Sequence, residues 1–187
     1  MTAVGYPIST GWGVWWSVPA MVVWLSMAIG FMMFINAVQV PRLKKIMAES
    51  STRVLDMRFF YSPAVAYGVL ERIGPQAREA YRRFLVRFDF AFPFIYSIAL
   101  ISALTVVLRP LASESLLMQD LRWLPACAGV LDWWENLAIL HMLQRFPSRD
   151  DRVARCAGFF TAGKWITVSL TLVLLLSALV VRGIYSL

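Results

Sequence analysis

The chain has 187 residues, of which 59% are hydrophobic and 16% are charged, and its mean hydropathy is +0.65. Soluble proteins carry about 25% charged residues, so this composition excludes a soluble globular protein and predicts a single integral membrane domain over 1–187. The formal net charge of +7 could indicate a nucleic-acid partner. The basic residues, however, gather in two loops beside apolar segments, so we expect membrane lipids as partners and no nucleic acid.

Four segments are long and apolar enough to cross a bilayer core of roughly 30 Å as helices. They cover residues of about 14–38, 84–108, 121–143 and 157–181. The first contains no charged residue, whereas each of the other three contains at least one. The expected fold class is therefore all-α: an integral membrane four-helix bundle with an amphipathic helix in its first loop.

Lys and Arg residues are distributed unequally between the segments that join these spans. The 39–83 loop contains nine and the 144–156 loop four, against three on the opposite side. Because cytoplasmic loops carry the excess of basic residues, we expect both loops on the cytoplasmic or matrix side and both termini outside. The membrane would be a bacterial inner membrane or an organelle inner membrane.

The 39–83 loop is long enough to form structure of its own. Ser62 and Pro63 are typical of a helix start, and Gly74 is typical of a helix stop. They predict a short amphipathic helix that lies on the inner membrane surface. Three residues at helical spacing would form its apolar face: Val65, Val69 and Ile73.

A second helix is expected to start at Pro75 and to continue into the second span. Pro93 should kink this helix about one turn beyond Asp89. Arginines near the inner end of the span have side chains long enough to extend to lipid head groups. The expected head-group residues are Arg82, Arg83 and Arg87.

The third span contains the sequence LDWWENLAILHML, in which polar residues interrupt an apolar segment. Asp132, Glu135 and Asn136 have the spacing i, i+3, i+4, so they lie on one face of a helix. A charged residue at mid-bilayer costs roughly 2.5–3.5 kcal/mol on insertion scales. A Leu or Ile contributes only about 0.3–0.6 kcal/mol, so we expect this span to require polar partners on other helices.

Depth in the bilayer identifies those partners. At about 1.5 Å per residue, Asp89 lies roughly 7–8 Å, Lys164 roughly 10 Å and Glu135 roughly 12 Å from the inner ends of their spans. We expect Lys164 to pair with Glu135 or Asp132, and the nearby amide and phenol side chains to donate hydrogen bonds. The predicted polar cluster consists of Asp89, Tyr96, Asp132, Glu135, Asn136 and Lys164.

Two interpretations of this cluster are open. It either locks the packing of the helices, or it binds a proton, an ion or a polar head group. Three acids against one internal base leave a surplus of negative charge. Either at least one carboxyl carries a proton, or a ligand or partner supplies the missing cation.

Other chemistry is not indicated by the sequence. Cys127 and Cys156 form neither a disulfide framework nor a metal spacing, and His141 is the single histidine. No nucleophile elbow, HExxH motif or phosphate-binding glycine loop is found. We therefore expect no cofactor, no metal and no catalytic residue.

From Leu55 onward the chain resembles a family of small four-pass, bacterial-type integral membrane proteins. The matching stretches are LDMRFFYS, LERIGPQAREAYRRF, FDFAFPFIY, LDWWENLAIL and GKW, which include FD…P…Y, DxxEN and KW motifs. The resemblance implies the four-pass fold and the positions of the polar residues, and it implies no reaction. Trp133 and Trp134 stand where aliphatic residues are usual in the family, which disfavours a roomy polar channel beside them.

The absence of a catalytic pattern favours a non-catalytic accessory or scaffold subunit of a larger membrane complex, such as an energy-converting one. Its partners would be other membrane subunits or copies of itself. One alternative is a membrane-embedded enzyme that acts on a lipid or isoprenoid through Asp132, Glu135 and Lys164. A cleft open to the inner leaflet would favour this enzyme, and a packed interior would disfavour it. Another alternative is a small proton-coupled carrier in which Glu135 or Asp89 titrates.

Overall fold

The computed structural model describes residues 16–46, 54–109 and 120–185. All regular secondary structure in these ranges is helical, as the sequence predicts. The elements in chain order are α1 (Val18–Phe34), the π turn η2 (Ile35–Gln39), α2 (Val40–Ile46), the 3-10 turn η3 (Leu55–Met57), α3 (Pro63–Arg72), α4 (Gly74–Phe84), the π turn η4 (Leu85–Asp89), α5 (Phe92–Leu108), α7 (Leu124–Arg145) and α8 (Asp151–Tyr185).

Three helical segments among the described residues are long and apolar enough to cross a membrane. They cover Val18–Leu43, Gly74–Leu108 and Asp151–Ile184, and they overlap the first, second and fourth predicted spans. The chain is therefore a multi-pass membrane protein. Helix α7 coincides with the third predicted span and has 22 residues. It differs from the other three because polar residues interrupt its apolar sequence.

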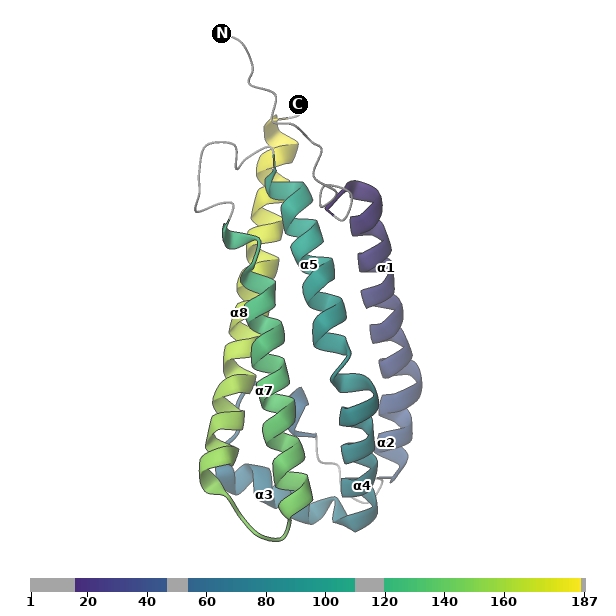
Figure 1. Cartoon of the computed structure of the whole chain (residues 1–187), viewed down its shortest axis with the longest axis vertical. Helices are drawn as coiled ribbons and strands as arrows, with labels where there is room; N and C mark the ends of the chain where they lie inside the picture. The colour runs from purple at the N-terminus through teal and green to yellow at the C-terminus, as the bar shows by residue number, and fades with distance from the viewer. Residues whose placement is uncertain (1–15, 47–53, 110–119, 186–187) are drawn as a thin grey trace.

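The long helices lie side by side (Figure 1). Helix α7 packs against α8 and α5, and α5 also packs against α1. The contact between α5 and α7 is close at Gly129, where an added Cβ would collide with the Ser97 hydroxyl. Helix α1 contacts the other helices of the chain mainly through α5, and most of its apolar side chains point outward.

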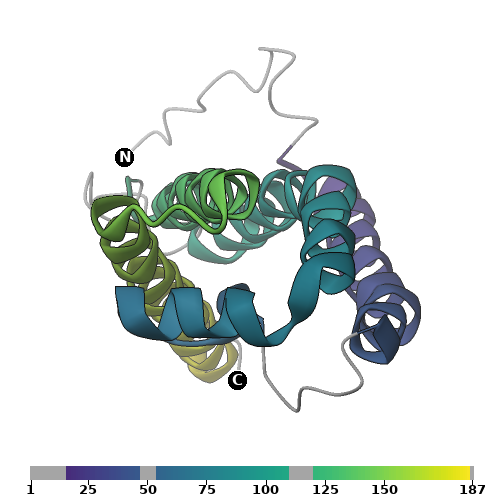
Figure 2. The same cartoon turned by 90° about the horizontal axis from the view of Figure 1, so that it is seen from below.

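Helix α3 lies across one end of the long helices, which we call the α3 end (Figure 2). It begins as predicted, because the Ser62 hydroxyl accepts a hydrogen bond from the Val65 amide and Pro63 occupies the first turn. It ends at Arg72, just before Gly74, whose φ of 73° is a left-handed conformation that glycine adopts without strain.

One residue of the predicted apolar face of α3 does not pack into the core, since the Val65 side chain is 40% exposed. The buried face is wider than the predicted one, because Ala66 and Leu70 also pack into the interior. The predicted Val69 and Ile73 are buried in the same core.

The second helical segment is irregular before Pro93. Helix α4 starts at Gly74 with Pro75 in its first turn and continues through η4 toward α5. Phe90 and Ala91 interrupt the helix, and Pro93 lies in the first turn of α5. The helix is therefore interrupted in the turn that precedes Pro93, near the position of the predicted kink. A proline has no N–H to bond the carbonyl four residues earlier, and its ring clashes with that carbonyl.

Candidate functional site

A buried ion-pair cluster joins α7 to α8. The Lys164 Nζ lies 3.2 Å from Asp132 Oδ1 and 2.6 Å from Glu135 Oε2. The exposed fractions are 7% for Lys164, 5% for Asp132 and 0% for Glu135. The predicted pairing is confirmed, and Lys164 contacts both candidate acids because the i, i+3 spacing places both on the face of α7 that packs against α8.

The remaining oxygens of the two acids also have partners. The Tyr96 hydroxyl on α5 donates to Asp132 Oδ2 at 3.2 Å. The Thr161 hydroxyl, one turn before Lys164 on α8, lies 2.7 Å from Glu135 Oε1. Each of the four carboxyl oxygens thus lies within 3.2 Å of an ammonium or a hydroxyl group. Buried charges are tolerated when their lone pairs are satisfied in this way.

Asn136 and Trp133 connect α7 to the irregular turn before Pro93. The Asn136 Nδ2 donates to the backbone carbonyl of Asp89 at 3.0 Å. The Trp133 Nε1 donates to the Phe90 carbonyl at 2.9 Å. These carbonyls lie where the regular helix is interrupted, so the side chains of α7 supply donors that the helix backbone does not.

The predicted cluster member Asp89 takes a different position from the other acids. Its Oδ2 is buried and has no hydrogen-bond partner among the described residues. Its backbone, through Asn136, is the part that is bonded to α7. Asp89 is still close enough to interact electrostatically with Asp132, Glu135 and Lys164.

Three side chains that complete the site were not predicted: Asp56 and Tyr61 belong to the segment before α3, and Thr161 lies one turn before Lys164 on α8. Asp56 in η3 accepts a hydrogen bond of 2.5 Å from the Tyr81 hydroxyl. Tyr61 is 2% exposed and lies near Thr161 and Glu135. Burial raises the pKa of Tyr61 well above its ordinary value, and the charge of Glu135 raises it further. In the sequence, the one indication of this part of the site was Asp56, the acid in the stretch LDMRFFYS.

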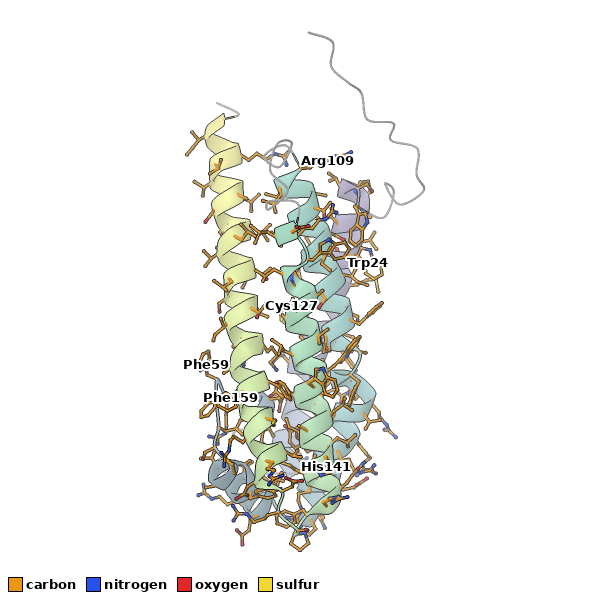
Figure 3. The ribbon with its side chains drawn as sticks, turned by 60° about the vertical axis from the view of Figure 1, so that its left-hand side comes forward. Trp24, Phe59, Arg109, Cys127, His141 and Phe159 are labelled. Atoms are coloured by element: carbon orange, nitrogen blue, oxygen red, sulfur yellow. The ribbon has the colours of Figure 1, made fainter. Side chains whose placement is uncertain are left out.

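The segment from Val54 to Ser62 runs beside α8 at the level of the ion-pair cluster. The Trp165 Nε1 donates to the Arg58 carbonyl at 3.1 Å. Gly158 leaves the space for this segment, because an added Cβ there would collide with the Tyr61 carbonyl. Figure 3 shows Phe59 and Phe159 on the same flank of α8. Phe60 packs on Phe159 with ring centroids 5.8 Å apart.

The charge balance of the site is more negative than the sequence predicted. Asp56 interacts electrostatically with the other three acids and with Lys164. Within the described residues, four carboxyls therefore interact with one another and with a single ammonium. No group of three or more His, Cys, Asp or Glu side chains suited to a metal ion is found in the same residues.

The predicted head-group arginines are separate from this cluster. Arg82 and Arg83 form ion pairs with Glu79 at 2.8 and 3.5 Å on the surface of α4. Arg87 lies in η4 with its side chain exposed. His141 is near Asp150 at 3.8 Å, away from the ion-pair cluster.

Comparisons with protein-family models, with curated proteins and with solved structures found no match to this chain. The resemblance to a four-pass family therefore stays a prediction.

Proposed function

We propose that this chain is a four-helix integral membrane bundle that serves as a non-catalytic accessory or scaffold subunit of a larger membrane complex. Helix α7 is the fourth span in this proposal. Its 22 residues extend over roughly 33 Å, which is enough for a bilayer core. Its charges are compensated by α5 and α8, so the helix does not present them to lipid.

The observation that carries this proposal is the complete pairing of the Lys164 cluster. An enzyme acting through Asp132, Glu135 and Lys164 would need these groups to reach a substrate. Instead they are almost fully buried and bonded to one another. Such an arrangement suits a role in holding α7 and α8 together, and it makes the lipid- or isoprenoid-directed enzyme the less supported alternative.

Helix α1 is the part best placed to contact another subunit. It has no buried residue of its own from Val18 to Phe34, and its contacts within the chain are mainly with α5. An added Cβ at Gly30 would meet nothing within 4 Å. Another membrane subunit, a second copy of the chain or lipid would cover this apolar face.

The location of the basic residues supports a proposal for how the chain is oriented in the membrane. Both basic loops join helices at the α3 end, and by the positive-inside rule this end faces the cytoplasm or matrix. Helix α3 then lies on the inner membrane surface, and Arg82, Arg83 and Arg87 are near the head groups. The membrane is a bacterial inner membrane or an organelle inner membrane.

A photo-crosslinking residue at Met33, which is 63% exposed on α1, tests the accessory role in the native membrane. The matched control is Tyr81, which is fully buried. We expect a discrete protein adduct from position 33 and none from position 81, with mass spectrometry identifying the partner. Adducts with lipid alone from position 33 would contradict the accessory role of α1.

A small proton-coupled carrier is the second candidate, and the excess of carboxyls over cations in and around the Lys164 cluster favours it. Carriers use intramembrane acids as proton sites, and their helices are often interrupted near those sites. The irregular turn between α4 and α5 is such an interruption, and it lies directly beside Asp89.

A further inference from the structure

The four acids in and around the Lys164 cluster differ in the donors that face them. Asp132 and Glu135 contact the Lys164 ammonium, and each also faces a hydroxyl group. Asp56 accepts the short hydrogen bond from Tyr81 and is partly exposed. These three acids have partners that stabilise a carboxylate, since hydrogen bonds and nearby cations favour the charged form.

Asp89 has the opposite surroundings. Its buried Oδ2 has no donor among the described residues. The charged groups that act on it are Asp56 from η3, Asp132 and Glu135 from α7, and Lys164 from α8. Three of these four are acids, and Lys164 is already within 3.2 Å of two of them. A fourth carboxylate here would have one buried oxygen without a donor and would be repelled by its neighbours.

Asn136 gives a second, independent indication of a missing donor. Its side chain is 0% exposed, and its Nδ2 donates to the Asp89 carbonyl, so its orientation is set by that bond. The other end of the amide, Oδ1, is buried without a hydrogen-bond partner in the described structure. Two buried acceptor oxygens, on Asp89 and Asn136, thus belong to residues that are already bonded to each other. A proton would turn the Asp89 carboxyl into a donor.

We propose that Asp89 is a proton-binding site that carries the surplus proton of the cluster at neutral pH. The Lys164 cluster then keeps its two ion pairs, and the interior carries one negative charge fewer. Because Asp89 forms no ion pair with any other residue in the described ranges, its O–H bond can break and its proton can pass to water without separating α7 from α8. This site is independent of whether the chain is an accessory subunit or a carrier.

Infrared spectroscopy of the full chain in lipid nanodiscs at pH 7 tests this assignment. Exposed acids are ionised at that pH, so a protonated-carboxyl C=O band reports a buried acid. We expect the band in the wild type, its loss in Asp89→Asn, and its retention in Glu79→Gln, which removes an exposed acid of α4. Asp89→Glu keeps the carboxyl and should shift the band.

The same spectra can overturn the proposal. Absence of a protonated-carboxyl band in the wild type at pH 7 would do so, and so would a band that survives unchanged in Asp89→Asn. If Asp89→Asn does not fold, the wild-type spectrum and Asp89→Glu decide the question. A band of unchanged position in Asp89→Glu would assign the proton to another acid.

Discussion

At the scale of single residues, Gly158 is needed for the close approach of the Val54–Ser62 segment to α8. An added Cβ would meet the Tyr61 carbonyl, which is backbone and cannot rotate away. Tyr61 in turn is buried beside Thr161 and Glu135. A change at Gly158 would therefore act on the polar cluster through the position of Tyr61.

We predict that Gly158→Ala lowers the free energy of unfolding by about 1–3 kcal/mol, the usual cost of overpacking. Gly30→Ala in α1 is the matched control, because its Cβ meets nothing within 4 Å. In a helix that control should be neutral or stabilising by roughly 0.5–1 kcal/mol. Thermal melting of both variants in the same detergent measures the difference. If Gly158→Ala melts no lower than Gly30→Ala, the close approach is wrong.

The residues of the site were predictable to different degrees. Asp132, Glu135 and Lys164 could be paired from the sequence, because a charge in an apolar span requires compensation and helix rise fixes its depth. The places of Asp56, Tyr61 and Thr161 in the site could not be predicted from the sequence. The first two belong to the Val54–Ser62 segment, whose path depends on contacts with α8, and a threonine in an apolar helix carries no comparable penalty.

At the scale of the elements, the irregular turn between α4 and α5 is stabilised from outside its own helix. Pro93 removes the N–H that would bond the Asp89 carbonyl four residues earlier. The Asn136 side chain on α7 supplies a donor to that carbonyl instead. The hydrogen bond from Asn136 on α7 therefore replaces the one that Pro93 removes from its own helix.

We predict that Asn136→Ala costs about 1–3 kcal/mol of unfolding free energy, the usual cost of an unsatisfied buried group. In a Pro93→Ala background the cost should be smaller, because residue 93 then has an N–H for the Asp89 carbonyl. A double-mutant cycle on unfolding in mixed micelles gives this coupling. Equal costs of Asn136→Ala in both backgrounds would show that the proline and the asparagine act independently.

The elements themselves were largely predictable. Length and hydropathy located three of the long helices, and Ser62, Pro63 and Gly74 gave the start and end of α3. The exposure of Val65 was not predictable, because three apolar residues at helical spacing do not determine which of them, or which neighbouring positions, reach the core. The π turn at Leu85–Asp89 also depends on the partners that α7 supplies.

At the scale of the whole molecule, the ion-pair cluster links α7 to α8, and Tyr96 extends the link to α5. Helix α7 carries two acids that would be costly in lipid, and α8 carries the cation that neutralises them. Removing one partner from a buried pair leaves an uncompensated charge and typically costs about 3–5 kcal/mol. The packing of α7 should therefore depend on Lys164.

The cost of Lys164→Met, measured as free energy of unfolding in mixed micelles, tests this claim most directly. We predict a loss of about 3–5 kcal/mol in the wild type and a loss smaller by at least roughly 2 kcal/mol in an Asp132→Asn/Glu135→Gln background. Lys45→Met, which changes an exposed lysine of α2, should be near neutral in both. An equal cost of Lys164→Met in the two backgrounds would contradict neutralisation of the α7 acids by α8.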